Sequence, residues 1–304
     1  MFAYQAFDLK ISSNLEFPEL LPLTQGQEDL VFDVSIKYGK VAEKGLENPT
    51  DDHLYFQTSP SQFWMNVPDI GRYLVLNGKE IIIDPVAGID EASIRVFLLG
   101  SCMGALLFQR NFIQLHGNAI KIDDHCISFV GHSGAGKSTL SGAFFKRGYS
   151  ILADDVCSIN EHGEVVPSFP QIKLWQDAAD QLKIDTKNLR RIRPDMEKFA
   201  IPLGAKFQPQ ALPLKTIYIL NPHNQPEFVF EQLTGMEKFS PLKPHTYRQE
   251  YLKGLGQEKH HFAQCIKLSK TVRIVSINRP MDGYKLDELV EQVLADIQKN
   301  QKNG

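Results

Sequence analysis

Cysteine is scarce in this sequence of 304 residues. The four cysteines are far apart, none belongs to a Cys-x-x-Cys pair, and none has a histidine at the spacing of a zinc site; they are Cys102, Cys126, Cys157 and Cys265. The sequence therefore lacks both a disulfide framework and a recognisable structural zinc motif. We predict that Cys126 and Cys157, which stand among apolar residues on expected strands, are small buried side chains with reduced thiols.

An excess of charge of one sign is also missing. The formal net charge is -3 and the pI is about 6.3, so no overall field would hold a nucleic acid or an anionic membrane. The longest apolar run, residues 96–108, is about half as long as a membrane span. The first residues lack the basic flank and apolar run of a secretion signal. We expect a cytoplasmic protein with neither nucleic acid nor membrane as partner.

The composition is that of an ordinary soluble globular chain, with 42% hydrophobic and 23% charged residues. The length suits one main domain with a smaller one attached. Residues 1–88 read mostly as strands, at 2–11, 31–38 and 63–67, with a hairpin whose turn is Asn77-Gly78 and a loop at 46–60. We therefore expect a smaller β-rich domain over residues 1–88 and a larger domain over residues 89–304.

The second region alternates between the two kinds of element. Residues 90–110 have the apolar pattern of a largely buried helix. Strands are expected at residues 114–122, 126–130, 149–153, 171–174, 215–220, 227–232 and 271–277, and helices at 139–147, 247–255, 260–269 and 286–298. This alternation predicts an α/β fold.

A glycine-rich loop lies between an expected strand and an expected helix. Its spacing is G-x-x-x-x-G-K-S, formed by Gly131, His132, Ser133, Gly134, Ala135, Gly136, Lys137 and Ser138, with Thr139 next. The glycines would let backbone N–H groups turn toward an anion, and the helix that follows would add its N-terminal dipole. Lys137 could reach the β- and γ-phosphates, and the Ser138 hydroxyl could bind Mg²⁺. The motif predicts a nucleoside triphosphate site.

Two adjacent carboxylates follow early, at Asp154 and Asp155, directly after the next expected strand. A right-handed crossover would place that strand beside the strand of the loop, with both carboxyl ends at one crevice. Neighbouring residues on a strand point to opposite faces, so one acid would serve the metal and the other the acceptor. A solvated pair at a strand end is the alternative interpretation.

Several basic residues are further candidates. His116 precedes the loop by one strand and could contact the nucleotide or the acceptor, although a single histidine is more often structural. The run from Lys183 to Lys198 is rich in basic residues, and such a run is usually a solvated face. In the sharper hypothesis Arg193 and Lys198 bracket the transferring phosphate or an acidic acceptor. His245 and Arg248 are weaker candidates for the same role.

Taken together, Leu115-His116-Gly117, the loop with Thr139, and Leu152-Ala153-Asp154-Asp155 resemble the catalytic domain of HPr kinase/phosphorylase. The resemblance covers about 40 residues. It implies a P-loop core of the kind shared with PEP carboxykinase, and transfer of a phosphoryl group from ATP to a protein serine with Mg²⁺. By the same resemblance Asp155 would be the base, His116 would assist it, Lys137 would hold phosphate, and Ser138 with Asp154 would bind Mg²⁺.

The sequence departs from that family in two places. Thr139 stands where the bifunctional enzymes have Glu, and no Arg-Gly-x-Gly stretch follows the aspartates. The resemblance therefore does not extend to HPr as the substrate, and we expect a kinase that acts on another acceptor. Whether a reverse phosphorylase activity exists stays open. The layout, with residues 171–175 and 245–248, resembles HPr-kinase-related proteins, some of which phosphorylate a ribosomally made peptide.

Two other functions compete with this one. The chain could bind ATP only as a conformational ligand, or it could hydrolyse a nucleoside triphosphate to drive another process. The set of Lys137, Ser138, Asp154 and Asp155 favours phosphotransfer to a protein or peptide. The sequence leaves open the identity of the acceptor, the choice between ATP and GTP, and the oligomeric state, which includes a homo-oligomer.

Overall fold

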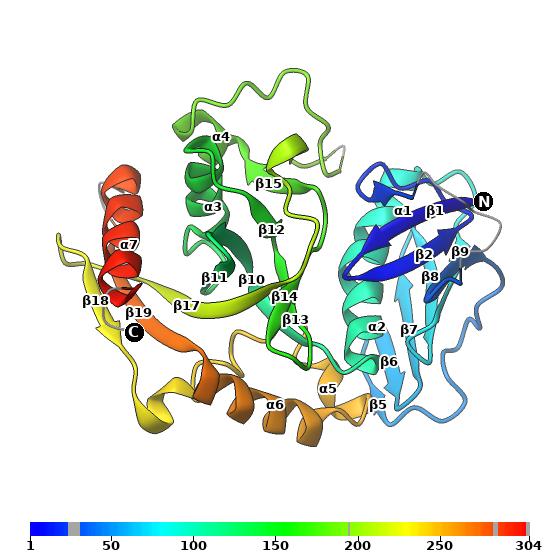
Figure 1. The fold of residues 1–304 in the computed structure, drawn as a ribbon. Coiled ribbons are helices and arrows are strands. Elements are labelled where there is room, and N and C mark those ends of the chain that lie inside the picture. Colours follow the sequence, from blue (N-terminus) through cyan, green and yellow to red (C-terminus); the bar gives the residue numbers. More distant parts are fainter. Residues whose placement is uncertain (24–30, 194, 282–284, 302–304) are drawn as a thin grey trace.

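The computed structural model describes residues 1–23, 31–193, 195–281 and 285–301, and within them the chain is a mixed α/β protein with three sheets (Figure 1). Nine strands form the N-terminal sheet, in the order β3-β1-β2-β4-β9-β8-β7-β6-β5. They are β1 (Phe2–Ala6), β2 (Leu9–Ser13), β3 (Leu21–Pro22), β4 (Val34–Tyr38), β5 (Asp51–Asp52), β6 (Phe56–Ser59), β7 (Gln62–Val67), β8 (Gly71–Leu76) and β9 (Glu80–Pro85). Alternate residues of β8 are buried, so one face of this sheet supplies the core.

The hairpin expected at Asn77-Gly78 is confirmed. Strands β8 and β9 pair in antiparallel register, and both turn residues have positive φ, 54° and 64°. The loop holds three residues rather than the expected two, because Leu76 pairs with Glu80.

Two expectations in this region were wrong in detail. Residues 2–11 are not one strand: Phe7 and Asp8 have positive φ and reverse the chain between β1 and β2. Residues 46–60, expected as a loop, contain β5 and β6, which extend the sheet at its edge.

A long helix covers the N-terminal sheet. It consists of α1 (Glu91–Phe97), a π-helical turn η2 (Leu98–Cys102) and α2 (Met103–Gln109), and the Asp90 side chain caps it by accepting from the Ser93 N–H at 2.8 Å. By length and composition this helix could cross a membrane, but 72% of it is buried inside the protein, as in the core helix of a soluble protein. Its apolar residues share one core with the sheet. The domain division expected between residues 88 and 89 stays a prediction, and these contacts group the helix with the N-terminal sheet.

The second sheet is built around two long strands, β10 (Ile113–Ile122) and β17 (Leu212–His223). One part has the order β12-β10-β11-β17-β19-β18, and β13 and β14 connect the other ends of β10 and β17, so five strands close into a ring. The remaining bounds are β11 (His125–Val130), β12 (Ile151–Ala153), β13 (Val156–Ile159), β14 (Glu164–Val166), β18 (Val229–Gln232) and β19 (Arg273–Pro280). The expected strands of this region are present, whereas β13, β14 and β16 (Lys198–Pro202) were not anticipated.

One expectation about strand order was wrong. The strand that carries the two aspartates, β12, lies beside β10 and not beside the loop strand β11. Both β11 and β12 are antiparallel to β10, and they are therefore parallel to each other with β10 between them. Their carboxyl ends still meet at one edge, because Val130 pairs with Gly117 and Ala153 pairs with Ala119 on the same strand.

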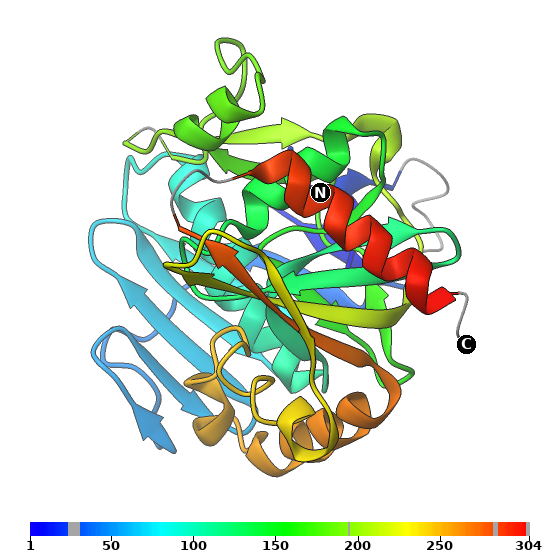
Figure 2. The ribbon, with the colours of Figure 1, turned by 90° about the vertical axis from the view of Figure 1, so that its left-hand side faces the viewer.

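Helices cover both faces of this sheet. Along β11, Ile127 and Phe129 pack toward α3 (Lys137–Lys146) and α7 (Leu286–Gln301), whereas Cys126 and Val130 pack toward α6 (Glu258–Thr271). Figure 2 shows α7 crossing in front of the strands and α6 below them. A separate ribbon of β15 (Gln171–Trp175) and β16 (Lys198–Pro202) lies against α3, and α4 (Gln176–Gln181) follows β15.

The chain returns to the N-terminal sheet late in its course. The short helix α5 (Tyr251–Gly254) contributes Tyr251, Leu252 and the following Leu255 to the same core as α1 and α2. Tyr251 packs against the rings of Phe56 and Phe63, with centroids 4.8 and 4.7 Å away. The first sheet is therefore completed by residues far along the sequence. The helix expected over 247–255 is shorter, and Arg248 just before it has positive φ.

Candidate functional site

The glycine-rich loop, residues 131–138, joins β11 to α3 as expected. Gly134 and Gly136 have φ of 80° and 93°, a backbone region that side chains with a Cβ rarely adopt. Helix α3 begins after Gly136 with no side chain capping it. The N–H groups of its first turn, which includes Ser138 and Thr139, thus point out of the helix at its positive end.

Three side chains hold this loop. Lys137 lies across it and donates from Nζ to the carbonyl oxygens of Gly131 at 2.8 Å and His132 at 3.0 Å. Asn118 Nδ2, on β10, donates to the Lys137 carbonyl oxygen at 2.7 Å. Arg279 Nε, on β19, donates to the Ala135 carbonyl oxygen at 2.9 Å. The loop is therefore fixed from β10, which pairs with β11, and from β19, which lies one strand further along the sheet, with Ser133 and Gly134 at its exposed tip.

The two aspartates lie at the same edge as the loop. Asp154 follows β12 and is 3% exposed, whereas Asp155 has φ of 75° and turns the chain so that its carbonyl oxygen accepts from the Gly117 N–H at 3.2 Å. A non-glycine residue in this left-handed region is uncommon and marks a locally strained turn. The turn gives the two neighbouring carboxylates different environments, one buried and one half-exposed.

Lys173, on β15, contacts both aspartates. Its backbone N–H donates to Asp154 Oδ2 at 2.8 Å, and its Nζ lies 3.2 Å from Asp155 Oδ2. Burial, helped by the charge of Asp155, raises the pKa of Asp154 to about 6. Burial acts in the same direction on Asp155, but the positive charges of Lys173 and Lys198 outweigh it and hold the pKa of Asp155 well below its usual range. Asp155 is therefore ionised at neutral pH.

Asp154 also has one oxygen that fits a metal ligand. Its Oδ1 is buried and, within the described residues, accepts no hydrogen bond. A buried carboxylate oxygen without a donor is costly, and a cation would satisfy it. A hydroxyl on α3, such as that of Ser138, is a hard oxygen donor of the kind Mg²⁺ prefers. The described residues contain no cluster of three or more His, Cys, Asp or Glu that could hold a metal ion.

His116 lies between Asp155 and a segment near the end of the chain. Its Nδ1 is 3.8 Å from Asp155 Oδ1, and its ring stacks on that of Tyr247 with planes 9° apart. Burial, and then the charge of Lys137, lowers the pKa of His116, so its ring is neutral at neutral pH. The backbone N–H of His116 donates to the His245 carbonyl oxygen at 2.7 Å, and the His245 ring packs edge-on against that of His132 in the loop, with centroids 5.4 Å apart.

The basic candidates divide into two groups. Lys198 lies on β16 near the site, since its charge lowers the pKa of Asp155, and its Nζ stands 5.5 Å from the centre of the Trp175 ring. Arg193 instead forms an ion pair with Asp195 in its own segment, at 3.2 Å. The bracket of Arg193 and Lys198 around a phosphate stays a prediction. The structure brings His245 to the loop, and Arg248 lies 5.5 Å from the Tyr247 ring.

Sequence reasoning missed three residues that touch the loop or the aspartates: Asn118, Lys173 and Arg279. For Lys173 a signal existed, because residues 171–175 stood out as a phrase, but the phrase did not say that β15 runs along the aspartates. For Asn118 and Arg279 no comparable signal existed, because β10 and β19 each carry several other polar side chains.

Comparison with known proteins adds little. No family model and no curated protein sequence matches this chain. Among solved structures, the HPr(Ser) kinase/phosphatase from Coxiella burnetii is similar over 62% of this chain and 98% of its own length, with 13% sequence identity and a TM-score of 0.33. A likeness of this strength carries no conclusion about this chain.

Proposed function

We propose that this chain is a kinase that transfers the γ-phosphoryl group of ATP to a hydroxyl, that of a serine, in a protein or peptide acceptor. One observation carries the proposal: a loop of phosphate-binding spacing and two differently placed carboxylates lie at the same edge of one sheet. Ligands of sheets with helices on their faces bind at the carboxyl ends of strands.

The proposed chemistry needs few groups. The first-turn N–H groups of α3 and the Lys137 ammonium would bind the phosphates. Asp155 would accept the proton of the acceptor hydroxyl while the oxygen of that hydroxyl bonds to the γ-phosphorus. The bond between the γ-phosphorus and the β–γ bridging oxygen breaks at the same time, and ADP leaves. A transition state of loose character needs an oriented hydroxyl more than a strong base, and an ionised Asp155 held by Lys173 suits that task.

Ser138 and Asp154 would hold Mg²⁺, for which the unpaired Asp154 Oδ1 is the supporting observation. The metal supplies neutralisation of charge on the β- and γ-phosphates when it is bound. The stacked ring of Tyr247 would keep His116 upright beside Asp155.

Two variants test the proposal. Lys137→Ala removes the ammonium that would contact the phosphates, so ATP affinity measured by calorimetry is expected to fall at least about tenfold. Asp155→Asn keeps the loop, so it is expected to bind ATP as the parent does and to lose transfer of label from γ-labelled ATP. Unchanged ATP affinity in the first variant, or full transfer in the second, would show the assignment to be wrong.

A nucleotide hydrolase is the second candidate. The side chains of Asp155 and His116 are 31% and 34% exposed, so a water molecule could reach them and take the place of the acceptor hydroxyl. Labelled phosphate appearing in water at the same rate with and without cell extract would favour hydrolysis. Label that enters a macromolecule only in extract would favour the kinase.

A further inference from the structure

Trp175 is a large apolar side chain that the fold leaves in solvent. It ends β15 and is 49% exposed, whereas the other tryptophan, Trp64, is 6% exposed and donates from Nε1 to the Ala42 carbonyl oxygen. Opposite Trp175 in the ribbon is Lys198, whose Nζ lies 5.5 Å from the ring centre. This contact is a cation–π pair, which keeps the ammonium over the ring.

The ribbon turns this pair toward the aspartates. Side chains two residues apart on a strand share a face, so Lys173, Trp175 and the cross-strand Lys198 lie on the same face of the ribbon. Lys173 on that face is the residue whose Nζ reaches Asp155. Trp175 therefore stands two residues along the strand, about 7 Å of backbone, from Lys173, whose ammonium contacts Asp155.

The charge on this face is positive. Within the described residues, Lys198 has the Trp175 ring as its close partner and no carboxylate at ion-pair distance. Its charge acts on Asp155, Asp154, His116 and Lys137, so it belongs to the field of the site. A cation that is held by a ring, with no carboxylate of the described residues at ion-pair distance, is suited to a carboxylate supplied by another molecule.

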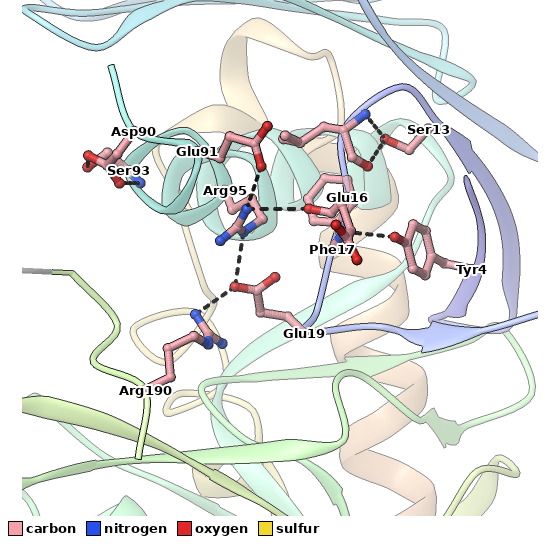
Figure 3. Close-up of polar contacts among 11 residues, drawn as sticks. Tyr4, Ser13, Glu16, Phe17, Glu19, Asp90, Glu91, Ser93, Arg95 and Arg190 are labelled. Atoms are coloured by element: carbon pink, nitrogen blue, oxygen red, sulfur yellow. Dashed lines mark hydrogen bonds and ion pairs between the residues drawn. The ribbon is translucent and has the colours of Figure 1, made fainter. Parts of the chain in front are cut away.

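The ribbon is held in place by contacts with the segment that precedes β16 and, through that segment, with the N-terminal part of the chain. The segment before β16 pairs along it, with the Ile192 N–H donating to the Lys198 carbonyl oxygen at 2.8 Å. Arg190 in this segment forms an ion pair with Glu19 at 2.7 Å, and Glu19 also pairs with Arg95 of α1 at 3.2 Å (Figure 3). The face with Trp175 and Lys198 is thus part of a braced element, which lowers the entropic cost of binding.

We propose that Trp175 and Lys198 form a docking platform for the acceptor, and that the platform selects a peptide segment with Asp or Glu next to the phosphorylated hydroxyl. The inference rests on the proposed kinase function. The acceptor backbone or an apolar side chain packs on the Trp175 ring, and the acidic side chain pairs with Lys198. An exposed ring on a flat ribbon suits a peptide, which the platform binds from one side, better than a small molecule that needs an enclosed pocket.

A positional peptide library tests the platform. Peptides with one central serine and each flanking position varied in turn are incubated with γ-labelled ATP and the full chain. We expect Asp and Glu to be preferred next to the serine, and we expect Lys198→Glu to reverse this preference toward Lys and Arg. Lys187→Glu, the same charge change at an exposed position outside the ribbon, is the matched control and is expected to keep the acidic preference.

Trp175→Ala separates binding from chemistry. For the best peptide of the library we expect its KM to rise about tenfold with kcat and the KM for ATP unchanged. A change in the KM for ATP instead would mean that Trp175 stacks on the nucleotide base, and the platform would be wrong.

The remaining outcomes are also decisive. If ATP binds normally but no peptide is labelled, or if labelled peptides show no acidic preference, the platform is overturned while the nucleotide site stands. If Lys137→Ala leaves ATP affinity unchanged, the proposed function itself has failed.

Discussion

Lys173 contacts both aspartates of the site. Its N–H binds Asp154 and its ammonium binds Asp155, so one residue contacts a carboxylate of raised pKa and one of lowered pKa. Burial alone would lower the pKa of Lys173, but the charges of Asp155 and Asp154 reverse the effect and raise it. Each ionised side chain here depends on the other, as in any partly buried pair.

A double-mutant cycle measures this dependence. Lys173→Met leaves the Asp155 carboxylate without its nearest cation, whereas adding Asp155→Asn removes the stranded charge. We expect the double variant to be more stable than the sum of the single losses implies, with a coupling of about 1 to 2 kcal/mol in denaturant unfolding.

Lys198→Met is the matched control for that cycle. Its ammonium sits over Trp175 and not within ion-pair distance of Asp155, so its coupling to Asp155→Asn should be smaller. Strictly additive losses for Lys173→Met and Asp155→Asn would contradict the pairing.

At the scale of residues, the sequence predicts a site whose residues are consecutive in the chain. The loop consists of eight consecutive residues whose spacing alone indicates a phosphate site. Lys173 is 18 residues from Asp155, and Arg279 is 144 residues from the carbonyl group of Ala135 that it contacts. Such contacts depend on which strands become neighbours, and no local pattern encodes that.

At the scale of elements, the position of β10 between β11 and β12 could not be predicted from the order of the strands in the sequence. The crossover argument correctly expects β11 and β12 to be parallel with their ends at one edge, but β10 lies between them. The reason is that β10 hairpins with β11 at residues 123–124 and keeps its other edge free for β12. A handedness rule constrains direction and leaves the choice of neighbour to packing.

Helix α6 carries a prediction about pH. His261 is buried, and its Nε2 lies 3.1 Å from Thr246 Oγ1, one residue from His245. Burial, with the charges of Lys243 and His260, lowers the pKa of His261 to about 4. A histidine with a depressed folded pKa contributes stability above its unfolded pKa of about 6.5, and this stability is lost as the pH falls toward 4.

His261→Gln removes that titration and keeps a hydrogen-bonding side chain. Between pH 6.5 and 4 the free energy of unfolding of the parent is expected to fall more steeply than that of the variant, by up to about 1.4 kcal/mol per pH unit. Denaturant unfolding at several pH values gives the two slopes. Parallel slopes would mean that His261 does not stay neutral in the fold.

At the scale of the whole molecule, one buried carboxylate connects the helix on the N-terminal sheet with the segment beside the ribbon of β15 and β16. Glu19 follows the β1–β2 hairpin and is 4% exposed; it binds Arg95 of the long helix and Arg190 beside the ribbon (Figure 3). Removing one member of a buried ionic group strands the charges that remain. Glu19→Gln is therefore expected to lower stability by about 3 kcal/mol and to expose residues 183–193 to trypsin.

Glu91→Gln is the control for this prediction. Glu91 pairs with the same Arg95 at 3.3 Å, but its side chain is 59% exposed, so its loss should cost less than about 1 kcal/mol. Equal losses from the two variants would show that Glu19 does not brace the ribbon. Chemical denaturation and limited proteolysis supply both measurements.

The late return of α5 has a consequence for synthesis on the ribosome. The N-terminal sheet and α1–α2 are translated first, yet their core includes Tyr251, Leu252 and Leu255. At ~10 residues per second, these side chains emerge on the order of ten seconds after α2. During that interval Phe56 and Phe63 lack the ring that packs against them, so the first core stays incomplete and exposes apolar surface of the kind that promotes aggregation.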